Sequence, residues 1–332
     1  MVSIGCADGE PSAQVTGPQR GLYHERVMET PGATIVVASY NHAQYVDQCI
    51  ASLAAQDYAN VDVIVTDDAS TDGSVAAIED ALARYGLTAL TLFASTNRGI
   101  CATFNAALAA IRTPYVAFLA ADDWMAPSRI SRQVALLEAA GPNVALVYGD
   151  LYQAAANGDV QETLYSSMYP ESWGFGRSGD LYQLLLRHTF IPAPSVMARA
   201  SCLREVGGYD ERLAIEDHDM WLRLARRYRL AFLAEPLVYY RAHPASLSMW
   251  FSGQRERLRW ETRLLMYAKH LGVSSDQDAM LAEQMYVEAK AAYRAGADPA
   301  AVRGYLWRWV RTGRSTAALG YAVAAQLGVP GT

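Results

Sequence analysis

Two Asp-Asp pairs are the residues of this chain best suited to chemistry, because each pair directly follows an apolar run. Asp67-Asp68 ends the run VDVIVTDD, and Asp122-Asp123 ends the run YVAFLAADD. Ligands of open α/β sheets bind outside the carboxyl ends of the strands, so we expect these carboxylates to meet at one sheet edge. Carboxylates suit a hard cation such as Mg²⁺ or Mn²⁺, and that cation suits a nucleotide diphosphate. Taken singly, each pair could instead cap the following helix.

The elements that would position these acids alternate in type along the chain. Apolar, strand-like runs occupy residues 33–39, 61–66, 87–94, 115–120 and 144–149. Amphipathic, helix-like stretches lie between them at residues 42–56, 73–85, 100–111 and 127–140. This alternation is typical of βαβ units. The sequence therefore predicts an α/β fold with a Rossmann-like, mainly parallel sheet flanked by helices.

The pattern also predicts three regions. Residues 1–30 are polar and without period, which indicates a mobile leader. Residues 31–250 carry the alternating pattern, with a long loop region and short strands at 152–180. Residues 251–332 are helical in pattern and predict a C-terminal helical region with natural breaks at glycines.

Composition narrows the class of protein. Of 332 residues, 52% are hydrophobic and 19% are charged, which is typical of a globular protein. The net charge of −6 gives no global field that favours nucleic acid, so we expect no nucleic-acid partner. The 4 cysteines show no paired metal-ligand spacing and indicate reduced thiols. No signal peptide or long apolar segment is visible, and a cytoplasmic protein is expected.

Further polar residues follow other predicted strands. The turn Ser39-Tyr40-Asn41 offers backbone amides and an aromatic ring to a planar base, and it also offers helix caps. An ionised carboxylate at Asp67 or Asp68 could accept hydrogen bonds from a base imide or from ribose hydroxyls. In Asn97-Arg98-Gly99, the glycine allows close approach of backbone to a ligand.

Taken together, these motifs resemble family 2 of the inverting glycosyltransferases, which have the GT-A fold. The resemblance covers about residues 31–250 and depends on the order and spacing of its motifs. The matching motifs are Ser39-Tyr40-Asn41, Asp67-Asp68-Ala69-Ser70, Asn97-Arg98-Gly99 with Asn105, 118–123 with Pro127, Gly207-Gly208-Tyr209-Asp210, Glu216-Asp217-His218-Asp219 with Trp221 and Arg223, and Tyr240-Arg241-Ala242-His243.

The resemblance implies a nucleotide-sugar donor, most simply a UDP-sugar, bound by residues 31–250 with Mn²⁺ or Mg²⁺. Asp122 and His243 are the implied metal ligands. Ala120 stands where the family's Asp-x-Asp element has its first acid. The implied donor-binding residues are Ala38, Ser39, Tyr40, Asn41, Asp67, Asp68, Asn97, Gly99, Asn105, Ala121, Asp122, Asp123 and Arg241, the last as a bidentate phosphate partner.

The resemblance also assigns Asp217 as the catalytic base. An inverting transfer needs one base, opposite the departing diphosphate, to deprotonate the acceptor hydroxyl. Glu216 and Asp217 could instead serve only as favourable charges in the first turn of a helix. Residues expected on the acceptor side are Trp173, Phe175, Glu216 and His218. Bacterial polysaccharide or glycoconjugate synthesis is the role that the resemblance implies.

Two other functions remain open at this stage. A nucleotidyltransferase would also bind a nucleotide with Mg²⁺, but the first strand lacks the Gly-rich basic loop that it needs. A non-catalytic glycan- or nucleotide-binding module is the second, and Ala120 is the best argument for it.

The sequence leaves several properties of the partners open. Residues 305–314 combine Trp307 and Trp309 with three arginines, so this helix either packs on the protein or lies on an anionic membrane beside a lipid-linked acceptor. The donor sugar, the acceptor, the linkage and the oligomeric state do not follow from the sequence.

Overall fold

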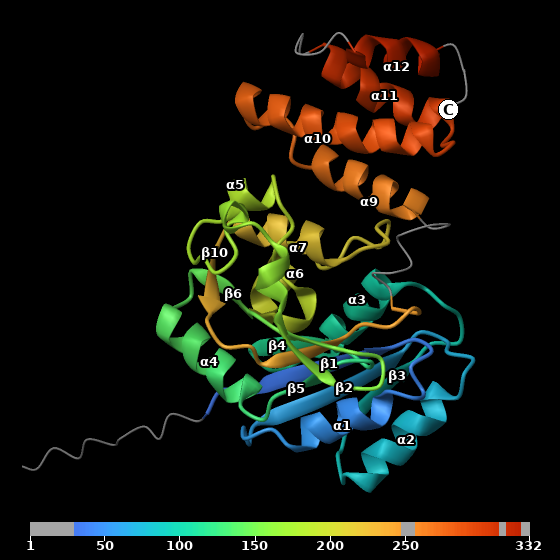
Figure 1. Cartoon of the computed structure of the whole chain (residues 1–332). Helices are drawn as coiled ribbons and strands as arrows, with labels where there is room; N and C mark the ends of the chain where they lie inside the picture. The colour runs from blue at the N-terminus through green and yellow to red at the C-terminus, as the bar shows by residue number, and fades with distance from the viewer. Residues whose placement is uncertain (1–29, 247–255, 312–316, 327–332) are drawn as a thin grey trace, which may run out of the picture. The chain divides into compact units, whose positions relative to one another are not determined.

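The computed structural model describes residues 30–246, 256–311 and 317–326. The predicted leader, apart from Thr30, lies outside the described residues. Most of the predicted elements are present, and Figure 1 shows them along the chain.

The central sheet has seven strands in the order β10-β6-β9-β4-β1-β2-β3. Four of its pairings are parallel, and only β9 runs antiparallel to its neighbours β4 and β6. The mainly parallel sheet predicted from the sequence is therefore confirmed. The strands are β1 Ala33–Ser39, β2 Val61–Asp67, β3 Leu90–Phe93, β4 Tyr115–Ala120, β6 Val144–Gly149, β9 Met197–Arg199 and β10 Arg229–Leu233.

Alternate side chains of the central strands fill two separate cores. Ile35 and Val37 pack on one face, whereas Val36 and Ala38 pack on the other, as the two-residue period of a strand requires. Both faces are buried, which explains the continuous apolar runs in the sequence. The helices of this part are α1 Val46–Ala54, α2 Ser74–Arg84, α3 Ile100–Ala110, α4 Arg129–Ala140, α5 Tyr182–Leu185, α6 Ala200–Glu205 and α7 Asp217–Ala225.

A second, smaller sheet of four strands has the order β5-β11-β7-β8. Part of it comes from the predicted loop region 152–180, which contains short strands and single turns of 3₁₀-helix. The strands are β5 Trp124–Met125, β7 Tyr152–Ala154, β8 Val160–Leu164 and β11 Val238–Arg241, and the 3₁₀ turns are η1 Tyr165–Met168, η2 Glu171–Trp173 and η3 Ala193–Ser195. Strands β5 and β10 are absent from the sequence prediction: β5 has only two residues, and the apolar stretch of β10 follows α7 closely along the chain.

The C-terminal part is helical, as predicted. Its described helices are α9 Glu256–Ala268, α10 Ser275–Arg294, α11 Pro299–Val310 and α12 Ala317–Gln326. Ser274 and Asp298 cap α10 and α11, each accepting a backbone N–H with its side chain. Trp309 is buried with Ala282 of α10, as expected of an amphipathic helix that packs on its neighbours. Within the described residues, no helix has the length and apolar character needed to cross a bilayer.

Candidate active site

Strand register brings the acidic motifs to one edge of the central sheet. Ser39 pairs with Asp67, and Ala38 pairs with Ala120. Asp68 and Asp122 follow these strand ends, and both line one cavity of about 340 Å³, the sheet-edge cavity. Its lining residues are Ala38, Ser39, Tyr40, His42, Asp68, Asn97, Gly99, Ile100, Thr103, Ala120, Asp122, Leu213, Ala214, Ala245 and Leu258.

The two acids of the first pair have different surroundings. Both oxygens of Asp67 accept hydrogen bonds from Ser70, at 2.8 Å from its N–H and 2.6 Å from its hydroxyl. Asp67 is buried, does not line the cavity and holds the turn at Ser70; its expected ligand contact stays a prediction. Asp68 accepts from the backbone N–H groups of Arg98 and Gly99, each at 2.8 Å. A carboxylate has about four lone-pair sites, so Asp68 keeps acceptor capacity toward the cavity.

The loop after β1 presents its backbone to the sheet-edge cavity. Ser39 Oγ is buried without a hydrogen-bond partner in the part of the chain that the structure describes. Asn41 has a left-handed backbone, with φ of 59°, and its side chain accepts from Thr71 N–H at 2.9 Å. The Asn41 side chain thus fastens this loop to the loop after β2, while Ser39 and Tyr40 line the cavity.

The predicted residues Asn97 and Asn105 differ in position relative to the cavity. Asn97 lines the sheet-edge cavity and donates to Asp68 O at 3.3 Å. Asn105 does not line it. Its side chain accepts from Tyr209 N at 2.8 Å and donates to Tyr209 O at 2.9 Å. Asn105 therefore holds the turn that follows Gly207-Gly208, and its expected donor contact stays a prediction. Ala121 is also fully buried, and its N–H donates to Ala38 O.

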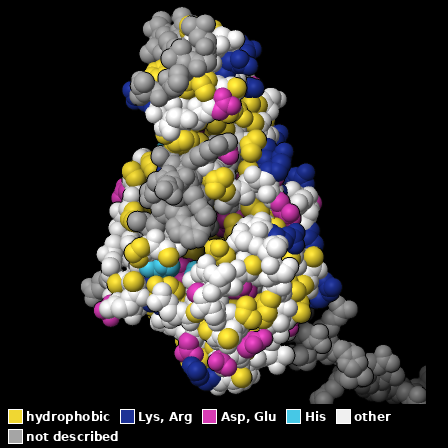
Figure 2. Space-filling model, turned by 90° about the vertical axis from the view of Figure 1, so that its right-hand side faces the viewer, with side chains coloured by type: hydrophobic (Ala, Val, Ile, Leu, Met, Phe, Trp, Pro, Cys, Tyr) yellow, Lys and Arg dark blue, Asp and Glu magenta, His cyan; other side chains and the backbone are white. Residues whose placement is uncertain are grey.

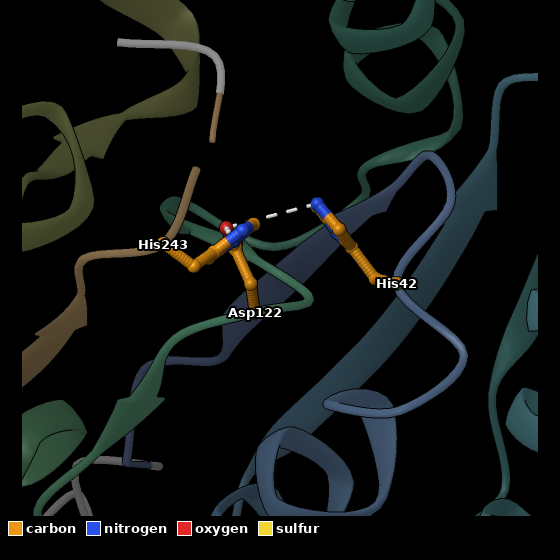
Figure 3. A group of neighbouring side chains, drawn as sticks. All are labelled: His42, Asp122 and His243. Carbon is orange, nitrogen blue, oxygen red and sulfur yellow. Dashed lines mark hydrogen bonds and ion pairs between the residues drawn. The ribbon is translucent and has the colours of Figure 1, made fainter. Parts of the chain in front are cut away.

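Three side chains that follow strands β1, β4 and β11 form a cluster: His42, Asp122 and His243 (Figure 3). One ligand atom from each residue lies within 4.8 Å of the others. His243 Nε2 lies 2.9 Å from Asp122 Oδ2, and His42 Nε2 lies 3.7 Å from the same oxygen. Figure 2 shows histidine and acidic atoms close together on this face of the molecule.

The donor set of this cluster fits a divalent cation. Asp122 Oδ1 and the Nδ1 atoms of both histidines are buried and have no partner among the described residues. Carboxylates bind Mg²⁺ and Mn²⁺, and imidazoles bind divalent transition-metal ions, so this donor set fits a divalent cation. His42 is absent from the sequence prediction, since only the fold shows that the loop after β1 faces Asp122 and the segment after β11.

The pKa shifts of the two acids in the second pair have opposite directions. Burial alone would raise the pKa of Asp122, but the hydrogen bond from His243 and the charge of His42 outweigh it, so the pKa is lowered. Burial and the adjacent charge of Asp122 raise the pKa of Asp123 well above its usual value. Asp122 is thus the ionised acid that offers ligand oxygens, and Asp123 Oδ1 accepts from the backbone N–H of Arg241 at 2.8 Å.

The Arg241 side chain is buried and makes its hydrogen bonds within the protein. Its guanidinium donates to Asp122 O at 2.8 Å, to Ala156 O at 3.0 Å and to Gln48 Oε1. It also lies between the rings of Tyr45 and Trp124, at 4.8 and 4.7 Å from their centroids. Each guanidinium nitrogen thus has a protein partner, which gives Arg241 a structural role, and its expected phosphate contact stays a prediction.

A second cavity adjoins the first, and both are lined by Ala120 and Asp122. This α7 cavity has a volume of about 570 Å³ and contains the acidic start of α7. Its lining residues are Ala120, Asp122, Asp123, Leu151, Tyr165, Met168, Thr189, Ile191, Pro192, Ala193, Pro194, Ile215, Glu216, Asp217, His218, Asp219, Tyr240, Ser246, Arg259, Thr262, Arg263 and Met266.

The pKa values of the Glu216 and Asp217 side chains are both raised, for partly different reasons. Desolvation and the charge of Asp217 raise the pKa of Glu216 to about 8. Desolvation also raises the pKa of Asp217, but the backbone N–H of His218, at 2.6 Å from Oδ1, opposes this rise. At neutral pH Glu216 therefore holds a proton. Asp217 is then the member of the pair that can accept one.

The other residues predicted on the acceptor side differ in position. His218 lines the α7 cavity, but its Nε2 lies 2.7 Å from Leu185 O and its Nδ1 lies 2.9 Å from Thr189 Oγ1. Burial lowers the pKa of His218 to about 4, so its imidazole is neutral.

Trp173 and Phe175, which were expected on the acceptor side, do not line the α7 cavity. Trp173 stacks on His188 at 4.8 Å between centroids, and Phe175 packs against Phe232 at 5.5 Å. The side chains of η1 and β11, including Tyr165 and Tyr240, line the cavity in their place. Aromatic content alone could not show which loop residues pack inward.

Comparison with known proteins identifies the family. The model of "Glycosyl transferase family 2" matches residues 34–205. An uncharacterized protein of Mycobacterium tuberculosis is 31% identical over 236 residues, covering 69% of this chain and 64% of that protein. The O-antigen biosynthesis protein RfbC of Myxococcus xanthus is 29% identical over 246 residues, covering 73% of this chain and 18% of RfbC. The chain thus spans less than two thirds of these relatives.

Solved structures share the fold at low identity. The S. aureus TarS fragment 1-349 in complex with UDP-GlcNAc has a TM-score of 0.62 and 18% identity, covering 89% of this chain and 81% of that one. The mannosyltransferase PcManGT of Pyrobaculum calidifontis, in complex with GDP-Man and Mn²⁺, has a TM-score of 0.57 and 19% identity, covering 91% and 88%. The chain therefore has the GT-A fold and belongs to glycosyl transferase family 2.

Proposed function

We propose that this protein is a metal-dependent, inverting glycosyltransferase that moves a sugar from a nucleotide-sugar donor to a hydroxyl acceptor. The observation that carries the proposal is the pair of adjoining cavities. Asp122 of the histidine–Asp122 cluster lines both cavities, His42 lines the sheet-edge cavity, and the Glu216/Asp217 pair lines the α7 cavity. The family membership and the nucleotide-sugar complexes of two proteins of similar fold support it.

The sheet-edge cavity is the proposed donor site. Asp68 and Ser39 offer hydrogen-bond acceptors and a hydroxyl to the nucleoside, and Gly99 lets backbone approach it. His42, Asp122 and His243 would hold the cation, which supplies Lewis-acid stabilisation of leaving-group charge when bound. We take UDP-sugar as the simplest donor, because a protein of similar fold binds UDP-GlcNAc.

The α7 cavity is the proposed acceptor site. Asp217 accepts the proton of the acceptor hydroxyl while that oxygen bonds to the anomeric carbon. The bond from the anomeric carbon to the diphosphate breaks in the same displacement, which inverts the configuration. Protonated Glu216 leaves Asp217 as the single base. A bacterial polysaccharide or glycoconjugate is the proposed acceptor, since one relative is named for O-antigen biosynthesis.

A binding module without turnover is the second candidate function. Ala120 favours it, because the position of the expected first acid carries no carboxylate. Release of free nucleotide from a donor separates the two, since a binding module retains the donor intact.

Calorimetric titration with UDP, GDP and dTDP, with Mn²⁺ and with EDTA, tests the donor site. The proposal predicts that one nucleotide binds in Mn²⁺ and binds much more weakly in EDTA. Absence of binding by all three in Mn²⁺ would contradict it.

A further inference from the structure

Helix α9 of the C-terminal region is fastened to the chain on both sides of Asp217. Before Asp217, the N–H of Ala214 donates to Thr262 Oγ1 of α9 at 2.9 Å. After Asp217, Lys269 Nζ, which directly follows α9, donates to Asp219 Oδ1 at 2.8 Å. The side chain of Asp219 is only 1% exposed, so this contact is made inside the protein. The position of α9 is therefore fixed relative to the start of α7.

Helix α9 also places a positively charged side chain in the wall of the α7 cavity. Arg263 lines this cavity together with Asp217. Its Nη1 donates to Glu288 Oε1 of α10 at 2.5 Å, and the Glu288 side chain is 9% exposed. Glu288 thereby fixes the guanidinium at the cavity wall, and the charge of Glu288 keeps the pKa of Arg263 raised despite burial.

The electrostatics of Asp217 require such a cation. Desolvation raises the pKa of Asp217, and the backbone N–H groups of His218 and Asp217 and then the positive charge of Arg263 oppose this rise. The other titratable or charged groups that line this cavity with Asp217 are Asp122, Asp123, Glu216, His218, Asp219, Tyr165, Tyr240 and Arg259. Desolvation and the charge of Asp217 raise the pKa of Glu216 to about 8, and His218 is neutral, so neither supplies a positive charge. Arg259 also lines the cavity, but Arg263 is the cation whose charge lowers the pKa of Asp217. A buried base that must stay ionised gains from an opposite charge nearby.

We propose that Arg263 is a positioning residue for the base: held by Glu288, it keeps the carboxylate of Asp217 ionised and ready to accept the acceptor's proton. This inference rests on the proposed role of Asp217. Arg263 itself exchanges no proton. The C-terminal helical region is then part of the catalytic centre, because α9 supplies the cation and α10 fixes it.

A double-mutant cycle tests this charge coupling without knowledge of the substrate. Thermal unfolding is measured at pH 8 and pH 4 for the wild type, Arg263→Gln, Asp217→Asn and the double variant. Glu288 is present in all four proteins, so its interaction with Arg263 cancels. We expect the Tm shifts to be non-additive by about 1–3 °C at pH 8, with the coupling favourable. At pH 4, where the raised pKa of Asp217 favours its protonated form, we expect the coupling to be smaller.

Two further variants complete the test. Arg263→Lys keeps the positive charge and should retain the pH-dependent coupling, even if Arg263→Gln folds poorly. Arg303→Gln, at an exposed arginine of α11, should be additive with Asp217→Asn at both pH values. Additive shifts of Arg263→Gln at pH 8, or equal coupling at both pH values, would overturn the proposal. Full turnover by Asp217→Asn would instead refute the proposed function, so the two failures are distinguishable.

Discussion

Asp122 is the residue at which the two cavities and the candidate metal cluster meet. Its carboxylate contacts His243 at 2.9 Å, and its backbone carbonyl accepts from the buried Arg241 guanidinium. Burial and then the charge of Asp122 also raise the pKa of Asp123. Asp122 is thus a candidate metal ligand, it contacts Arg241 of the second sheet, and its charge affects the pKa of Asp123.

His42→Ala should weaken Mn²⁺ binding by about tenfold or more, because loss of even an outer-shell partner of a metal site costs about 10–100-fold. Calorimetric titration with Mn²⁺ alone measures the change. His188→Asn is the matched control, since His188 stacks on Trp173 away from the cluster and should leave the affinity unchanged. Unaltered Mn²⁺ affinity in His42→Ala would remove His42 from the ligand set.

Glu216→Gln should stabilise the protein at alkaline pH. The pKa of Glu216 is raised in the folded state from 4.5 to about 8, so its favourable contribution is fully present below 4.5 and is lost as pH rises through 8. Glutamine avoids this loss. The gain in Tm over the wild type should therefore be larger at pH 9 than at pH 5, at about 2–4 °C for each kcal/mol. A gain that is independent of pH would contradict the assignment of a protonated Glu216.

Part of the residue-level site could be predicted from the sequence. Asp68 and Asp122 were predictable, because carboxyl ends of neighbouring parallel strands share one sheet edge. His42 and the internal role of Arg241 were not, since both depend on contacts with segments more than 70 residues distant. Asp67 shows the limit of motif reasoning: it lies at the end of β2, but both of its oxygens accept hydrogen bonds from Ser70.

At the scale of elements, the loops after β1 and β2 act as one unit. Ser70 Oγ accepts from Asn41 N–H at 2.8 Å and donates to Asp67 at 2.6 Å. Asp72 accepts from Ala43 N–H at 3.0 Å. These bonds hold the backbone of the loop after β1 against the sheet-edge cavity. Two residues with left-handed φ, Asn41 and Ala69, lie in these loops and are stabilised by the surrounding bonds.

Ser70→Ala should destabilise the protein by about 1–3 kcal/mol, because it leaves the buried Asp67 oxygen and the Asn41 N–H without this partner. It should also weaken nucleotide binding, since the loop that presents Tyr40 is released. Urea unfolding and nucleotide titration measure the two effects. Thr71→Ala is the control, because Thr71 is exposed in the same loop. Equal effects of the two substitutions would refute this account of the loop.

Element prediction succeeded where periodicity was strong. Strands β1, β2, β4 and β6 are buried apolar runs, and their positions follow directly from the sequence. Strand β5 has two residues and gains its pairing only from β11, so no local pattern marks it. Strand β10 begins at the exposed Arg229 and depends on β6 for its assignment.

At the scale of the whole molecule, the C-terminal helices are connected to the sheet domain through charged contacts. Lys269 pairs with both Asp210 and Asp219, and Asp219 also accepts from Arg223 at 2.8 Å. A helical region was predictable from the pattern of residues 251–332. Its contacts with α7 were not, because they depend on how the helices dock.

Lys269→Met should cost about 1–2 kcal/mol of stability, less than for a fully buried pair, because the Lys269 side chain is 22% exposed and Arg223 still pairs with Asp219. The change removes the cation that links α9 to α7. Urea unfolding measures the loss, with Arg303→Met at an exposed position of α11 as control. A loss no larger than that of the control would show that the contact does not stabilise the docking of α9.

The central claim is that Asp217 is the base of a sugar transfer, and the substitution Asp217→Asn tests it most directly. Release of nucleotide from UDP-GlcNAc and GDP-mannose is measured in Mn²⁺ with a bacterial glycan extract as acceptor, alongside calorimetric nucleotide binding. The account predicts that Asp217→Asn binds nucleotide like the wild type, because side-chain volume is preserved, but loses about 10²–10⁴-fold in turnover. Turnover by Asp217→Asn at the wild-type rate would contradict it.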